Sequence, residues 1–288
     1  MTAGALALVL GAAVLHATWN LFAKRAGAGG VGFVWLCAVL AAAIYAPVTI
    51  VVLFVTRPQL GGTELLFLVG SGALHACYFT LLQRGYRVGD LSVVYPLARG
   101  TGPMLSTALA IVFIGERPSA LALAGAALVC GGVFVVGRAT TRDGTRGSAR
   151  AGVVFGLATG VLIATYTLWD RHAVAELAIP ALILDWAANA VRGALLTPFV
   201  LARRAALREI WAAHRRDVIA VALFAPLAYI LVLTALAVSP VSYVAPAREI
   251  SILIGTVLGA RVLQEGRLGP RMAGATAMVM GLVALAVG

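Results

Sequence analysis

The sequence predicts an all-α integral membrane protein, and both its composition and its patterning indicate this class. Of its 288 residues, 61% are hydrophobic and only 11% are charged, and the mean hydropathy is +0.99. Soluble domains average about 45–50% apolar and about 25% charged residues. The apolar residues form continuous runs, far longer than the roughly ten residues of a membrane β-strand. Together these features exclude a soluble enzyme, a disordered chain and a nucleic-acid-binding domain.

A helix that crosses a bilayer needs about 20 mostly apolar residues, and that length divides the chain into ten predicted spans. Charged residues separate the runs, as Lys24 and Arg25 do after the first and Arg57 does after the second. The connections are short and leave no room for a soluble domain. In chain order the predicted spans are 3–23, 32–56, 63–83, 91–114, 119–137, 151–170, 179–202, 217–238, 241–262 and 269–288.

The two longest polar stretches are 138–150 and 203–217, and both are rich in arginine. With ten spans, the connections on one side of the membrane carry 16 Lys and Arg residues and those on the other side carry 3. Because Lys and Arg concentrate in cytoplasmic loops, this bias predicts that the basic loops are cytoplasmic and that both termini lie outside. The net charge of +11 is therefore interpreted as a topology signal. The expected location is a plasma membrane of bacterial type.

The three cysteines and the N-terminal apolar run do not change this interpretation. Cys37, Cys77 and Cys130 lie inside apolar runs and lack metal-ligand spacing, so neither a disulfide framework nor a zinc site is predicted. The first apolar run lacks a basic leading region and a small-residue cleavage site, so it is predicted to be a span rather than a cleavable signal peptide.

The two halves of the chain resemble each other. The segment 14–22 aligns with 161–169 at a shift of 147, and 91–96 aligns with 241–246 at a shift of 150. The pairs Gly115-Glu116 and Gln264-Glu265 share a glutamate at a shift of 149. Three anchors in the same order predict two five-helix repeats, 1–137 and 151–288, joined by the basic loop 138–150. Shared apolar composition alone is the alternative explanation.

An odd number of helices per repeat has a geometric consequence. The second copy enters the membrane from the opposite side, so the halves are inverted and related by a pseudo-two-fold axis in the membrane plane. Many secondary transporters have this architecture, with the substrate site near the midplane between the repeats.

Several of these residues also resemble a known family. The segment His16-Ala17-Thr18-Trp19-Asn20, the prolines Pro96 and Pro246, and the two glutamate pairs are similar to motifs of the EamA family, in the drug/metabolite transporter superfamily. The resemblance covers essentially the whole chain. It implies a ten-helix secondary carrier of small metabolites, amino acids among them and often by export, with a central cavity lined mainly by helices 1, 3, 4, 6, 8 and 9. Family descriptions often place both termini in the cytoplasm, the reverse of the charge-based prediction.

Ionisable residues inside spans are costly and are functional candidates by default. Arg99 lies three residues after Pro96, and Glu249 lies three residues after Pro246, so the repeat places them at equivalent positions that face each other. They could neutralise each other as a structural ion pair or hold a zwitterionic substrate. Arg248 adds a second positive group beside Glu249.

Aromatic and amide side chains provide the remaining candidates for substrate binding. His16, Trp19 and Asn20 share one helix face, and the aromatic part of that face recurs as Tyr166 and Trp169. Such groups can stack with and hydrogen-bond a small ligand, although interhelical bonding and interface-seeking tryptophan are the alternative. The other aromatic candidates are His75, Tyr78, Tyr95 and Tyr243.

The remaining ionisable residues in or near the spans have structural interpretations, and for the two histidines a functional alternative stays open. Asp170 is predicted at a helix end, exposed to water. Asp185, Asn189 and Arg192 form one polar stripe that is interpreted as bonding a neighbouring helix. His16 and His75 could shuttle protons in a coupled carrier, or simply pack.

The sequence therefore predicts a secondary active transporter that moves a small amino-acid-like or other polar or amphipathic solute by alternating access. Its expected partners are that solute, the lipid bilayer and a coupling proton, with no nucleic acid, no cofactor and no metal. No phosphate-binding lysine loop supports ATP-driven transport. The alternatives are an integral membrane enzyme, for which no cluster of carboxylates or nucleophile on one membrane face is evident, and a structural or assembly protein.

Overall fold

The computed structural model describes residues 1–26, 30–88, 91–139, 149–254 and 268–288, and within these ranges it is helical with no strand. The first half contains α1 (Ala3–Arg25), α2 (Gly30–Thr56), α3 (Gly62–Val88), α4 (Leu91–Leu109), the π-helix η1 (Ala110–Ile114) and α5 (Ala120–Ala139). The second half contains α6 (Ala149–Ala175), α7 (Ala181–Leu201), α8 (Arg204–Val238), α9 (Val241–Ala247) and α11 (Leu268–Val287).

The all-helical prediction is confirmed for the described residues, and the helix ends agree with the predicted spans to within five residues except in α8 and after α9. An apolar run becomes a helix in a bilayer because helices satisfy their own backbone hydrogen bonds. Six described segments are long and apolar enough to cross a membrane: Ala3–Ala23, Gly30–Thr56, Gly62–Gly85, Val93–Ile114, Arg150–Ala175 and Arg204–Val238. The protein is an integral multi-pass membrane protein.

The full number of spans stays a prediction. α5 and α11 contribute the shorter apolar segments Ala120–Val136 and Met272–Val287. The ninth predicted span, 241–262, extends beyond the described residues, as does most of the predicted connecting loop 138–150.

Two details differ from the sequence-based expectations. The stretch 203–217 is not a loop, because α8 begins at Arg204 and is interrupted only by a kink at His214 (φ −127°, ψ 18°). A charged segment that projects past the apolar run can continue the helix when its side chains reach water. α6 continues to Ala175, so Asp170 lies inside a helix and has 0% of its surface exposed.

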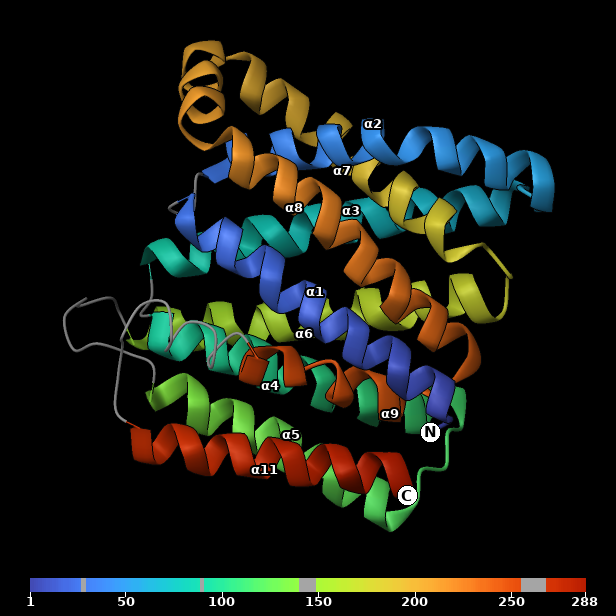
Figure 1. Ribbon diagram of the computed structural model, residues 1–288, viewed down its shortest axis with the longest axis vertical. Helices are drawn as coiled ribbons and strands as arrows, with labels where there is room; N and C mark the ends of the chain where they lie inside the picture. Colours follow the sequence, from blue (N-terminus) through green and yellow to red (C-terminus); the bar gives the residue numbers. More distant parts are fainter. Residues whose placement is uncertain (27–29, 89–90, 140–148, 255–267) are drawn as a thin grey trace.

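The helices stack in layers across the bundle (Figure 1). α2 and α7 pack together at one edge, and α5 and α11 pack together at the opposite edge. Between them, α1 packs along α8, α3 packs along α6, and α4 contacts both α6 and α9. The helices α1, α3, α5 and α7 finish at one end of the bundle, whereas α2, η1, α6 and α8 finish at the other end, where both termini lie.

The α5–α11 contact depends on glycine. A Cβ atom on Gly125 would lie 2.7 Å from the backbone oxygen of Gly281, and one on Gly281 would lie 2.6 Å from the oxygen of Gly125. Gly132 and Gly274 face each other in the same way, at 2.7 and 2.9 Å. These four glycines let the two backbones approach closely, as small residues do between membrane helices.

Candidate functional site

A cluster of charged side chains lies where α4 approaches the end of α9. Arg99 comes from α4, and its Nε lies 3.0 Å from Oε2 of Glu249. The Nε of Arg248 lies 3.6 Å from the other carboxylate oxygen of Glu249. All three residues are buried, and Glu249 is 0% exposed. The ion pair between Arg99 and Glu249 that the repeat pattern suggested is therefore present in the structure.

The helix break after Pro246 positions the second half of this cluster. α9 ends at Ala247, Arg248 and Glu249 form a turn, and the chain is helical again over 250–254. The N–H of Glu249 donates to the carbonyl of Pro246, a tighter bond than the α-helical one. Pro246 has no N–H to donate to the carbonyl of Ser242, so the turn just before the charged residues lacks one helical hydrogen bond.

The first helix closes one side of the cluster. The Nε2 of His16 lies 3.4 Å from Nη2 of Arg99, and the side chain of Tyr95, one turn before Arg99, interacts with the same guanidinium. Nε and Nη2 of Arg248 are buried without a hydrogen-bond partner among the described residues. Two guanidinium groups share one carboxylate, so the cluster has one uncompensated positive charge and free donors.

A second group, of aromatic and acidic side chains, joins α3, α6 and α8. The ring of His75 lies 4.5 Å from that of Tyr166 and 5.3 Å from that of Tyr229, and Tyr78 lies 5.5 Å from Tyr166. The hydroxyl of Tyr229 donates to Asp170 at 2.6 Å. Arg248 interacts electrostatically with both His75 and Asp170, so the two groups adjoin.

The structure brings together eight of the twelve residues that the sequence suggested for substrate binding. They are His16, His75, Tyr78, Tyr95, Arg99, Tyr166, Arg248 and Glu249.

The other four residues make their main contacts elsewhere. The amide of Asn20 donates to the backbone of its own helix at His16. Trp19 packs in a hydrophobic cluster of α1, α2 and α8, and its ring meets that of His16 edge-on at 4.8 Å. Trp169 donates to the carbonyl of Phe67 and stacks on that ring. The hydroxyl of Tyr243 donates to the carbonyl of Gly288 at the end of the bundle.

Sequence reasoning missed two members of the second group and one bond that positions α9. The hydropathy pattern places Asp170 in water, whereas it is buried, and no motif marks Tyr229, a polar side chain in an apolar span. Glu116 accepts hydrogen bonds from the N–H groups of Val241 and Ser242 at 2.7 and 2.9 Å, and so caps α9 from the first half of the chain. The polar stripe of α7 bonds within its own helix, because Asn189 donates to Asp185 and accepts from Arg192.

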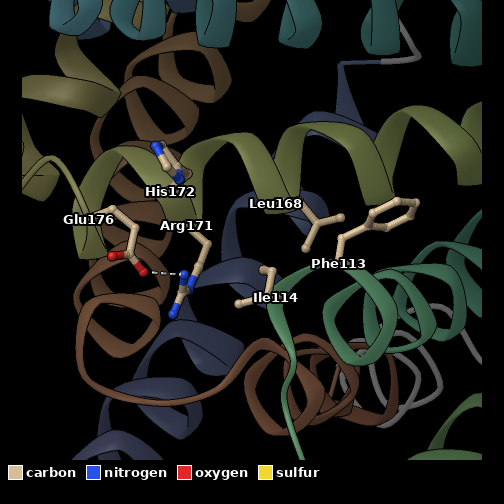
Figure 2. Close-up of a pocket in the computed structure, with 6 residues that line it drawn as sticks. All are labelled: Phe113, Ile114, Leu168, Arg171, His172 and Glu176. Atoms are coloured by element: carbon tan, nitrogen blue, oxygen red, sulfur yellow. Dashed lines mark hydrogen bonds and ion pairs between the residues drawn. The ribbon is translucent and has the colours of Figure 1, made fainter.

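A surface pocket of about 400 Å³ lies apart from both groups, between η1 and the end of α6. Figure 2 shows Arg171 paired with Glu176 at one side of it and Phe113 at the other. None of the twelve candidate residues lines this pocket, and Phe113 is largely exposed. It is a recess of the outer surface rather than part of the charged cluster.

Comparison with known proteins agrees with the expected family. Residues 3–138 match the EamA-like transporter family, so the resemblance inferred from the motifs is confirmed for this part of the chain. No curated protein matches the chain. Among 28 matching chains of solved structures, one titled "Crystal structure of protein" is 14% identical with a TM-score of 0.79, and the alignment covers 99% of this chain and 96% of that chain. At this identity the likeness shows a shared fold over nearly the whole length.

Proposed function

Because residues 3–138 belong to the EamA-like transporter family, we propose that the whole protein is a secondary transporter for a small polar metabolite. The observation that carries the proposal is the buried cluster of Arg99, Arg248 and Glu249. Charge inside a membrane protein is costly and is retained where it serves transport or binding. Arg248 has free donors there, and a solute with a carboxylate or another anionic group would satisfy them.

An inverted repeat is the architecture that we propose for this carrier. In such a repeat α1 corresponds to α6, α2 to α7, α3 to α8 and α5 to α11. Exchanging the two halves then converts the α1–α8 contact into the α6–α3 contact and leaves the α2–α7 and α5–α11 contacts unchanged. All of these pairs pack together. The reciprocal glycine contacts of α5 and α11 also fit such an exchange, because Gly125 and Gly132 precede Gly274 and Gly281 by 149 residues each. The five-helix boundaries 1–137 and 151–288 remain part of this proposal.

Alternating access follows from this architecture as the proposed mechanism. The two groups draw on α1, α3 and α4 of the first half and on α6, α8 and α9 of the second, so rocking of one half against the other would expose them to each side in turn. The break beside Arg248 leaves that segment free to change conformation without unwinding a continuous helix. We place the basic end of the bundle, where α1, α3, α5 and α7 finish, in the cytoplasm.

Flux into proteoliposomes tests the proposal. The purified protein is reconstituted into liposomes, which are loaded with one solute from a panel of radiolabelled amino acids and related small zwitterions and anions. Exchange of that solute across the membrane is measured against liposomes without protein. We expect exchange of at least one solute, and loss of that exchange in Arg248→Gln. Arg171→Gln is the matched control, because Arg171 lies at the end of α6 in an exposed pair with Glu176.

The alternatives predict different outcomes in this assay. Chemical conversion of a solute without its movement would indicate an enzyme. The absence of both movement and conversion across the panel would favour a structural or assembly role. Unchanged exchange in Arg248→Gln would remove this residue from the site.

A further inference from the structure

His75 presents its two ring nitrogens to two different acceptors. Its Nδ1 lies 2.8 Å from the backbone oxygen of Ser71, one turn earlier in α3. A carbonyl oxygen only accepts hydrogen bonds, so Nδ1 carries the hydrogen. The other nitrogen, Nε2, lies 3.9 Å from Oδ2 of Asp170. In the neutral imidazole Nε2 then carries a lone pair and can only accept a hydrogen bond. Here it faces a carboxylate, which also only accepts.

Asp170 needs a further partner in this environment. Its side chain is 0% exposed, and one oxygen, Oδ2, accepts a hydrogen bond from Tyr229. The Ser71 hydroxyl also interacts with the carboxylate, but the other oxygen, Oδ1, is buried with no hydrogen-bond partner among the described residues. A buried carboxylate is stable only when it is paired or neutralised. When His75 is neutral and Asp170 is ionised, two acceptors therefore face each other with no hydrogen between them. A single proton on either residue provides the missing donor for both.

We propose that His75 and Asp170 form one proton-binding site, closed by Tyr229, and that this site carries the coupling proton of the transporter. The proton leaves a hydronium ion on one side, bonds to Nε2 or to the carboxylate, and passes to water on the other side. The pair is open only at His75, where 13% of the side chain is exposed, whereas the side chain of Asp170 is fully enclosed. The coupling role rests on the proposed transport function, whereas proton binding does not.

The chemistry of the site favours a proton over a metal cation. Hard cations take about six or more oxygen ligands. The close groups here are one carboxylate, one phenol and an imidazole nitrogen, with the Ser71 hydroxyl 3.5 Å from Nδ1 of His75. Among the described residues these are too few oxygens to enclose sodium or calcium.

The surroundings connect this proton to the charged cluster. Arg248, from the turn after α9, interacts electrostatically with both members of the pair and also pairs with Glu249. When the proton leaves, the pair gains a negative charge that attracts Arg248, and when the proton binds, that attraction is lost. The other ionisable groups that face the pair are Tyr78 of α3, Tyr166 of α6, Asp185 and Arg192 of α7, and Tyr229 of α8.

Nitrogen NMR of the histidine-labelled protein in lipid nanodiscs tests proton binding without any solute. The chain has four histidines, and His75→Gln assigns the signal of interest. We expect Nδ1 of His75 to stay protonated at every pH, Nε2 to gain the proton on acidification, and Asp170→Asn to change that titration. His172, exposed on α6, is the internal control, and its signal should not differ between the two proteins.

Three results would overturn the proton site: a neutral His75 protonated at Nε2, a titration that Asp170→Asn leaves unchanged, or a response to sodium ions at constant pH. Coupling is then tested in proteoliposomes with a solute that the wild type exchanges. Asp170→Asn should keep exchange at equal pH and lose accumulation driven by a pH gradient. Retained accumulation would refute the coupling role. Absence of any wild-type flux would refute the transport proposal and leave the NMR result standing.

Discussion

Replacing Glu249 by glutamine should destabilise the protein far more than replacing its partner Arg99. Glu249 is shared by two guanidinium groups, so Glu249→Gln leaves Arg99 and Arg248 buried without the carboxylate that pairs with both of them. Arg99→Gln instead leaves Arg248 paired with Glu249. The double variant keeps a single cation, which is the net charge of the wild-type cluster. The expected order of destabilisation is therefore Glu249→Gln first, with Arg99→Gln and the double variant well below it.

The distances set the size of the effect. At an effective dielectric constant of about 20, Coulomb's law gives about 5.5 kcal/mol for the 3.0 Å contact of Arg99 and about 4.6 kcal/mol for the 3.6 Å contact of Arg248. The two attractions are comparable, so Arg248 can replace most of what Arg99 supplies. Removing one partner of a buried pair costs about 3–5 kcal/mol when a charge is left alone. We expect at least about 4 kcal/mol for Glu249→Gln and about 1–2 kcal/mol for Arg99→Gln.

Reversible unfolding of the purified protein in detergent, followed by circular dichroism, measures these free energies. The exposed pair of Arg171 and Glu176 is the control, since 18% and 52% of their side chains are accessible. Arg171→Gln should cost at most about 1 kcal/mol. Equal costs for Arg99→Gln and Glu249→Gln would show that Arg248 does not stabilise Glu249, and the reasoning would fail. If the pair binds solute, the double variant should fold but not transport.

Three further predictions follow from the contacts at the bundle ends and edge. Glu116→Gln should cost about 1–2 kcal/mol in the same unfolding assay, because an anion caps α9 from another part of the chain, and an unchanged stability would contradict the capping role. Gly132→Ala should cost about 1–3 kcal/mol, since its Cβ would lie 2.7 Å from a backbone oxygen of α11. Gly131→Ala should be harmless, since no atom of another described segment lies within 4 Å of a Cβ there. In a variant without the three native cysteines, Arg208→Cys should resist an impermeant thiol reagent in intact cells and Arg57→Cys should react, and the reverse pattern would invert the proposed topology.

The charged cluster shows how far sequence reasoning reaches into the site. The ion pair of Arg99 and Glu249 could be predicted because charge inside a span is costly and the repeat gave both residues equivalent positions. Asp170 could not be assigned in this way. The residues after it are polar, so hydropathy ends the span there, whereas the helix continues to Ala175 and buries the carboxylate.

Residue type alone was also too weak a criterion for the aromatic candidates. Trp169 and Tyr243 have the right chemistry for a ligand site, but their polar atoms bond to carbonyls at Phe67 and Gly288. Tyr229, which no pattern distinguished, completes the group with His75 and Asp170.

The amino-acid sequence determined the membrane class, most of the helix bounds, the two-fold pattern of motifs and the pairing of Arg99 with Glu249. Each of these depends on local composition or on spacing along the chain, and the apolar length that a bilayer requires is a one-dimensional quantity. Only the tertiary structure decided that His75, Asp170 and Tyr229 meet, that Arg248 pairs with Glu249 and acts electrostatically on Asp170, and that Glu116 caps α9. Those contacts depend on how each helix is rotated and tilted against its neighbours, and the packing of the whole bundle decides that.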